Sequence, residues 1–153
     1  MFSITRIRPL AAALVCLSVG CLVGCSKPQD LTKDTQESHM KPLAILYGRY
    51  IGQHQGRPPR DEAAFKSFIE SQGKEYLEHL GVKNADDLFI SERDGEPYVV
   101  HYGKLDLRSQ RLGGFVTMYE KKGADGLRFV ASELGTIEKL TDEEFAQAVP
   151  KAK

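Results

Sequence analysis

Residues 40–54, MKPLAILYGRYIGQH, repeat their apolar side chains with the period of an α-helix and decide how the rest of the chain folds. The repeating side chains, at intervals that a helix aligns, are Met40, Leu43, Ala44, Tyr47, Tyr50, Ile51 and His54. Such spacing places them along one face, and Pro42 fits a first turn. We therefore expect a helix with this face in the core, ended by Gly56 and by the pair Pro58-Pro59.

A second helix is expected to begin near Asp61. Asp61 and Glu62 place negative charge at the positive end of the helix dipole. The apolar side of this helix consists of Ala64, Phe65, Phe68 and Ile69. Gly73 interrupts the helix, and residues 75–80 add a further turn. The sequence Asp-Asp-Leu-Phe at 86–89 predicts a short turn onto the core.

The hydrophobic period changes from helical to alternating after residue 91. Strands rich in β-branched and aromatic residues are predicted over 98–102, 114–120 and 127–134. Asp125-Gly126 predicts a turn between the last two strands, and Thr141 with Glu144 matches a capping box ahead of a short C-terminal helix. The sequence thus predicts one α+β domain over residues 38–150, with N-terminal helices packed on a small antiparallel three-stranded meander.

The start of the chain has the layout of a secretory signal. Arg6 and Arg8 precede an uncharged apolar run over residues 10–23, which would extend about 21 Å as a helix. A hydrocarbon core requires about 20 apolar residues, so this run is short for a membrane span, and small residues follow it as in a cleaved signal. Residues 1–24 are therefore predicted to form a signal peptide, with an uncleaved membrane helix as the alternative.

The sequence Leu22-Val23-Gly24-Cys25 resembles the bacterial lipobox, in which an aliphatic residue, a small or aliphatic residue, and Gly or Ala precede a cysteine. The resemblance implies cleavage between Gly24 and Cys25. It also implies a diacylglyceryl thioether on Cys25 and an acyl chain such as palmitate on its new amine, which together anchor a protein in a membrane. Ser26 resembles the outer-membrane-directed pattern, so the expected location is the bacterial cell envelope, on the periplasmic face of the outer membrane.

The composition of the remaining chain fits a tethered domain without disulfides. Residues 26–37 hold one aliphatic side chain, and we expect segment 25–37 to be the lipidated cysteine and a flexible tether. The signal carries the other two of the three cysteines, so no pair of thiols remains. It also carries two of the 21 basic residues, which leaves 19 against 21 acidic residues. This balance argues against a nucleic-acid partner.

Two short motifs in the globular part resemble motifs of type II secretion pseudopilins. One is Gly56-Arg57-Pro58-Pro59 after the first helix, and the other is Asp94-Gly95-Glu96-Pro97-Tyr98 at the first strand. The chain lacks the usual tryptophan of the second motif, and it has a lipobox where pseudopilins have a long apolar helix. The patterns GRPP and DGEPYVV are also similar to those of small bacterial lipoproteins of unknown function. These resemblances imply relatives but do not assign an activity.

No arrangement of residues in the sequence matches a catalytic or metal-binding motif. The histidines lack the spacing of zinc enzymes, and no serine lies in a GxSxG or SxxK context. Gly113-Gly114 could cradle an anion, but without a P-loop or GxGxxG pattern it is interpreted as a turn. The sequence therefore predicts no metal site and no cofactor other than the lipid on Cys25, and it favours a domain that is not an enzyme while leaving enzymatic activity open.

One cluster of side chains remains as a candidate docking site for a protein partner. Three arginines and two tyrosines flank the GRPP turn, namely Arg49, Arg57, Arg60, Tyr47 and Tyr50. Arg and Tyr are enriched in protein interfaces, whereas a solvated charged face is the simpler interpretation.

The leading hypothesis is a lipid-anchored, non-enzymatic module that binds a protein partner or serves envelope assembly. One alternative is an envelope hydrolase or small-ligand-binding protein whose site joins distant residues. Another is a pseudopilin-like accessory of a secretion system.

Overall fold

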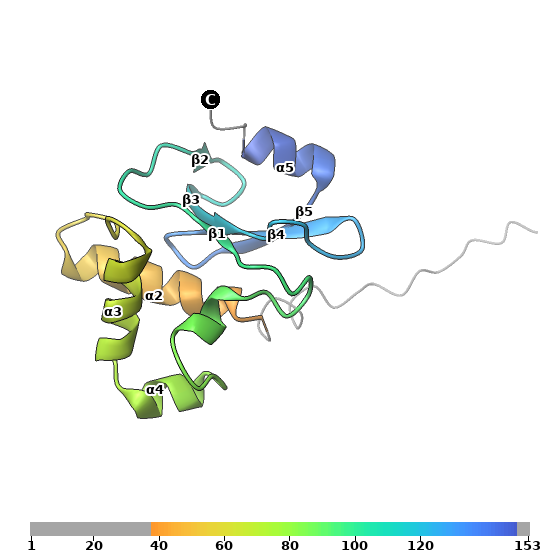
Figure 1. Cartoon of the computed structure of the whole chain (residues 1–153). Coiled ribbons are helices and arrows are strands. Elements are labelled where there is room, and N and C mark those ends of the chain that lie inside the picture. Colours follow the sequence, from red (N-terminus) through yellow and green to blue (C-terminus); the bar gives the residue numbers. More distant parts are fainter. Residues whose placement is uncertain (1–37, 150–153) are drawn as a thin grey trace, which may run out of the picture.

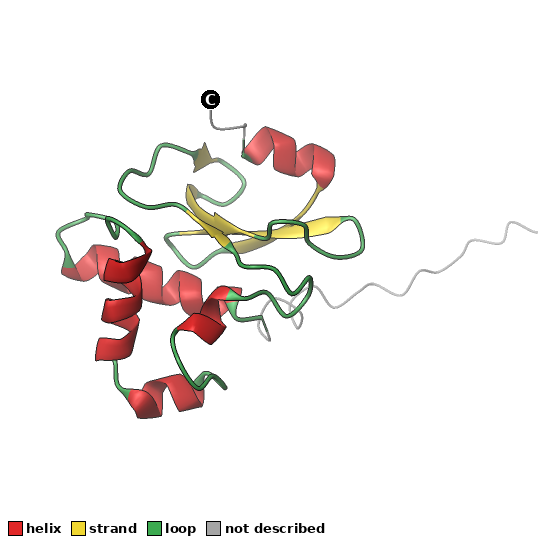
Figure 2. Ribbon diagram, viewed as in Figure 1, coloured by secondary structure: helices red, strands yellow, loops and turns green. Residues whose placement is uncertain are grey.

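The computed structural model describes residues 38–149 as a β-sheet with helices on both faces (Figure 1 and Figure 2). The α+β class is confirmed. Within the described residues, no helix combines the length and the apolar content that a membrane span requires. The predicted signal peptide, the cleavage and lipidation site at Gly24 and Cys25, and the tether all lie outside the described residues and stay predictions.

Most helical segments precede the sheet along the chain. They are α2 (Met40–Gln53), α3 (Glu62–Ser71), α4 (Lys74–His79) and the 3-10 helix η1 (Asp86–Phe89), and α5 (Asp142–Ala148) follows the last strand. The Asp61 carboxylate accepts the Ala64 N–H at 2.8 Å and caps α3. Thr141 and Glu144 form the predicted reciprocal capping box that begins α5.

The sheet is antiparallel throughout. Its strands are β1 (Val99–Val100), β2 (Arg108–Ser109), β3 (Gly114–Tyr119), β4 (Leu127–Ser132) and β5 (Ile137–Thr141). They pair in the order β1-β3-β4-β5, and β2 pairs with the first residues of β3. The prediction of three strands was wrong, because the sheet contains five strands. The predicted short C-terminal helix is α5, which follows β5, so the helices lie on both sides of the sheet along the chain. Neither missed strand has a clear hydrophobic pattern. β2 is too short to show the alternation of a strand, and β5 completely buries only the Leu140 side chain.

Helix α2 lies at the centre of the larger hydrophobic core. The first half of its predicted apolar face, through Tyr47, is fully buried. Leu46 is fully buried as well, because α2 contacts β3 and β4 on one side and α3 and η1 on the other. His54, the last member of the predicted stripe, is exposed at the end of the helix and does not reach the core.

A β-bulge in β3 divides the interior into two cores. Val116 and Met118 are two residues apart and would share a face in a regular strand, but the pairing of β3 with β4 shifts register between them. Met118 therefore joins the core under α2. Val116 instead packs with Val130 and Leu140 in the smaller core, to which Phe145 of α5 also contributes.

Helix α2 contacts the turn between β4 and β5 at two positions. The Lys41 ammonium donates to the Gly135 carbonyl at 2.7 Å. One residue from the middle of α2, Gly48, faces the backbone of the same turn so closely that a Cβ placed there would lie 2.4 Å from the Glu133 carbonyl oxygen. Glycine at position 48 thus permits a close approach of helix and strand backbones.

Candidate functional site

The candidate site lies around the end of α2, where the chain turns sharply. Gln55 and Gly56 both have positive φ angles, 57° and 81°, which end the helix in the left-handed conformation. The Gly56 N–H donates to the Ile51 carbonyl at 2.9 Å. Pro59 is buried, and its carbonyl accepts the Gly103 N–H at 2.8 Å. The turn is therefore tied to the loop that leads from β1 to β2.

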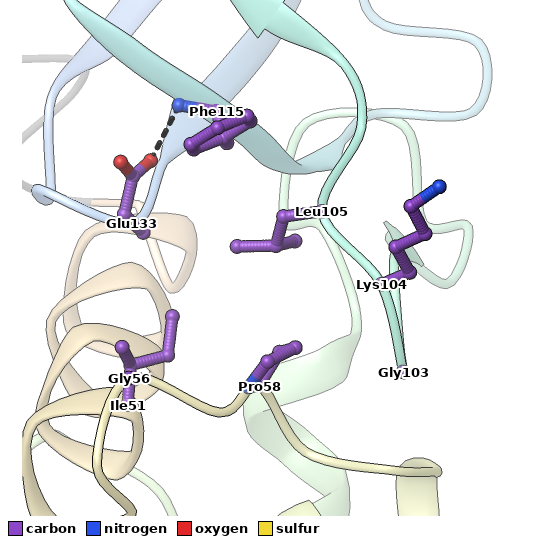
Figure 3. A pocket seen from close by; sticks show the side chains of 8 residues that line it. All are labelled: Ile51, Gly56, Pro58, Gly103, Lys104, Leu105, Phe115 and Glu133. Carbon is purple, nitrogen blue, oxygen red and sulfur yellow. Dashed lines mark hydrogen bonds between the residues drawn. The ribbon is translucent and has the colours of Figure 1, made fainter.

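An apolar pocket of about 360 Å³ opens on one side of this turn (Figure 3). Its walls are Ile51, Gly56, Pro58, Gly103, Lys104, Leu105, Phe115 and Glu133. Figure 3 shows the side chains of Ile51 and Pro58, from α2 and the turn after it, converging with Leu105 from a loop that is distant in the sequence. We call this hollow the apolar pocket.

Glu133 supplies the acidic group of the apolar pocket, and the sheet holds its carboxylate in place. Its Oε2 accepts the Phe115 N–H at 2.6 Å, the dashed line in Figure 3. A Cβ on Gly114 would lie 2.7 and 2.8 Å from the two carboxylate oxygens, so glycine there leaves room for them. Within residues 38–149 no basic side chain forms an ion pair with Glu133. The pocket thus carries one fixed negative charge.

A second hollow of about 420 Å³ opens on the other side of the turn and shares Pro58 with the first. Its walls are Tyr50, Gln53, His54, Gln55, Arg57, Pro58 and Arg60, and we call it the cationic groove. The His54 ring stacks on Tyr50, with ring centroids 3.8 Å apart, and its Nδ1 donates to the Tyr50 carbonyl at 2.7 Å. In the neutral ring this bond places the proton on Nδ1 and leaves the His54 Nε2 as an acceptor.

The two arginines give the cationic groove its charge. Arg60 pairs with the neighbouring carboxylate of Asp61 at 3.1 Å, and both side chains are well exposed. Arg57 is exposed and has no acidic partner in the part of the chain that the structure describes. The groove therefore presents positive charge beside the aromatic ring of Tyr50.

The structure brings three of the five predicted docking residues together. Tyr50, Arg57 and Arg60 line the cationic groove. Arg49 is exposed but lies over the ring of Tyr76, to whose hydroxyl it donates at 3.2 Å, outside the lining of the groove. Tyr47 does not belong to the surface, because it is fully buried and its hydroxyl donates to the His101 carbonyl at 2.5 Å.

Sequence reasoning missed the apolar pocket, because its lining is assembled from distant segments. Leu105, Phe115 and Glu133 come from a loop, a strand and a turn, and none lies in a recognisable motif. The alternative of a hydrolase requires groups that activate water or a nucleophile. The apolar pocket is lined by one carboxylate and by no His, Ser or Cys. Among residues 38–149, no three His, Cys, Asp or Glu side chains are grouped to hold a metal ion.

A buried polar network lies away from the turn, around Glu120. The Glu120 carboxylate is fully buried and accepts the Ser91 hydroxyl at 3.0 Å, the Phe129 N–H at 2.8 Å and the Arg93 guanidinium at 2.6 Å. Arg93 also stacks over the Phe129 ring at 4.0 Å and donates to the Ala124 carbonyl at 3.0 Å. Burial raises the pKa of Glu120, and the Phe129 N–H and the Arg93 charge oppose that rise. Both oxygens of the Glu120 carboxylate accept hydrogen bonds, so the network has a structural role.

The DGEP motif fastens this same region. Burial alone would raise the pKa of Asp94, but backbone N–H groups of Glu96, Gly123 and Lys122 donate to its carboxylate and together lower it. The motif therefore ties the loop before β1 to the loop between β3 and β4. Its chemistry is that of a structural turn.

A scan against protein-family models, a search of curated proteins and a search of solved structures found no match to this chain.

Proposed function

We propose that this chain is a lipid-anchored protein of the bacterial cell envelope, and that the surface around the GRPP turn docks a protein partner. The partner segment inserts an apolar side chain into the apolar pocket and places acidic side chains over the cationic groove. The observation that carries the proposal is that the two hollows lie on either side of one residue, Pro58.

The apolar pocket supplies the anchoring part of this surface. A pocket of about 360 Å³ between Ile51, Pro58 and Leu105 has the composition that receives an aliphatic or aromatic side chain. Burying one such side chain contributes about 1.5–3 kcal/mol. The residues forming the walls belong to ordered segments tied to one another, so the pocket exists before the partner binds.

The cationic groove supplies the selective part. Arg57 is exposed and forms no ion pair within residues 38–149, and Arg60 pairs with one exposed carboxylate, that of Asp61. A partner with Asp or Glu beside its apolar side chain complements these charges, which speeds encounter and disfavours basic partners. A nucleic acid would need a wider basic surface, and the chain carries as many acidic as basic residues.

The position of the site suits a protein held at a membrane. α2 is 14 residues long, about 21 Å at the helical rise. The described chain enters α2 at its N-terminal end, and the site lies at the C-terminal end (Figure 1). A flexible tether of twelve residues spans about 20 Å. With Cys25 in the lipid, the site would be directed away from its own anchor, toward partners in the periplasm.

Site-specific photocrosslinking in intact cells tests the docking surface. We expect benzoylphenylalanine at position 105 to form one defined adduct, with a partner peptide that carries acidic residues. Charge reversal in Arg57→Glu/Arg60→Glu should lower the adduct yield at least tenfold, about 1.4 kcal/mol of binding, because the groove would repel the partner's acidic groups.

The matched control reverses two exposed lysines of the helical layer, Lys74→Glu/Lys83→Glu, and should leave the yield within about twofold. The same photoreactive residue at position 83 should form no adduct with that partner. Equal yields from positions 105 and 83, or equal losses in the two double variants, would rule out the proposed surface.

A further inference from the structure

A third hollow lies at the hairpin of β2 and β3, and it is separate from the proposed docking surface. Its volume is about 570 Å³, and its lining residues are Arg108, Ser109, Gln110 and Gly113. None of these four lines the apolar pocket or the cationic groove. All three side chains in the lining offer hydrogen-bond donors, and none is acidic.

The donors in this hollow are not used within the described part of the chain. The exposed Arg108 guanidinium contacts the Phe115 ring at 5.9 Å but forms no ion pair among residues 38–149. Ser109 is 7 % exposed, and its Oγ only accepts, from the Leu112 N–H at 3.4 Å. Its hydroxyl proton is therefore available, as are the two N–H groups of the Gln110 carboxamide.

Two acidic groups at the hairpin are paired with its other arginine, whereas the Glu133 carboxylate accepts the Phe115 N–H and forms no ion pair among residues 38–149. Arg111 donates to Glu138 at 3.4 Å and to Glu144 at 2.5 Å. An adjoining hollow of about 330 Å³ shares Arg108, Ser109 and Gln110 with the first and continues along Arg111 and Glu144. Arg111 brings one positive charge to these two carboxylates, and Arg108 adds a second positive charge that forms no ion pair within residues 38–149.

The hairpin holds the backbone of these residues in place before any ligand binds. Arg108 pairs with Phe115 and Ser109 pairs with Gly114 across the two strands. Gly113, with a φ of 69°, closes the turn by donating its N–H to the Gln110 carbonyl at 3.2 Å. The buried side chain of Leu112 anchors the loop in the smaller core. Binding therefore requires no ordering of the backbone, and only the exposed side chains of Arg108 and Gln110 lose rotamer freedom.

We infer that this hollow binds the phosphate group of a small phosphate or phosphate ester. A guanidinium offers two parallel N–H donors to an oxyanion, and the Ser109 hydroxyl and the Gln110 carboxamide donate to its remaining oxygens. The hollow is much larger than one phosphate, so an ester with a polar body fits better than the free ion. This inference does not depend on the docking surface.

Titration followed by amide NMR of the protein, purified with its own N-terminus in detergent, tests the site. The probes are inorganic phosphate, glycerol 3-phosphate and dihexanoyl phosphatidylglycerol below its micelle concentration. We expect saturable shifts confined to residues 107–114, with the esters binding more tightly than free phosphate. Stronger binding of glycerol 3-phosphate would indicate a soluble ester, and stronger binding of the short-chain lipid would indicate a headgroup.

Two variants separate specific binding from general charge effects. Arg108→Gln should weaken binding of the best probe about tenfold, and Ser109→Ala about threefold. Lys83→Gln removes the same charge from an exposed site in the helical layer and should change binding by less than twofold. Shifts that fail to saturate with all three probes, or an equal loss in Arg108→Gln and Lys83→Gln, would overturn the inference.

Discussion

Gly48→Ala should destabilise the fold by about 2 kcal/mol, although alanine favours a helix over glycine by 0.5–1 kcal/mol. A Cβ at position 48 would lie 2.4 Å from the Glu133 carbonyl oxygen. That atom belongs to the backbone, so α2 and the turn after β4 must separate, and overpacking of this kind costs about 1–3 kcal/mol or more. Urea denaturation monitored by circular dichroism measures the change in the free energy of unfolding.

The same helix offers a matched control at Gly52. A Cβ there would meet no atom within 4 Å, so Gly52→Ala should stabilise the protein by about 0.5–1 kcal/mol through helix propensity alone. The two substitutions are chemically identical and lie one turn apart. Equal effects of the same sign would show that α2 does not approach the β4–β5 turn as described.

Arg93→Met should cost about 3 kcal/mol at pH 7, because it removes the cation from a buried ion pair and leaves the Glu120 charge without it. Lys121→Met likewise replaces a cation by methionine, here in an exposed pair with Glu96, and should cost under about 1 kcal/mol. Denaturant unfolding of both variants measures the difference.

The cost of Arg93→Met should also depend on pH in a defined direction. Burial raises the pKa of Glu120, and without Arg93 nothing of opposite charge opposes the rise. The pKa of Glu120 in the folded variant then lies above its pKa in the unfolded chain, which is near 4.3. The variant therefore keeps its full stability below about pH 4.3 and loses stability as the pH rises through the folded pKa. The difference from wild type should shrink from pH 7 to pH 4. Adding Glu120→Gln should abolish this pH dependence, and a difference that grows toward pH 4 would contradict the role given to the pair.

Local patterns in the sequence predicted the helical part of the fold well. The apolar spacing from Met40 to Ile51 identified α2, and the Thr141–Glu144 capping box identified the start of α5. Both signals act over a few residues, which is why they can be read without the tertiary structure.

The sheet was predicted less completely, because its missing features depend on long-range pairing. β2 exists only through its pairing with the start of β3. β5 is held by β4 and by the packing of α5, although its own side chains are mostly half-buried. The bulge that sends Val116 and Met118 to different cores is a matter of register between two strands. No local pattern contains that information.

The candidate site shows the same limit. The GRPP turn and its arginines were visible in the sequence. The helical stripe placed Tyr47 in the core, where the structure has it, although Tyr47 had also been named among the docking residues. The apolar pocket depends on Leu105 and Phe115 reaching the turn from outside α2. A docking surface built from distant segments becomes visible only when the helical layer and the sheet are placed together.

Intact-protein mass spectrometry on the native envelope tests most directly whether this domain works as an anchored module. The account predicts a wild-type chain that begins at Cys25 and carries the mass of a diacylglyceryl group and an acyl chain. It predicts that Cys25→Ser keeps residues 1–24 and carries no lipid. A wild-type chain without lipid, or the same mature N-terminus in both proteins, would contradict it.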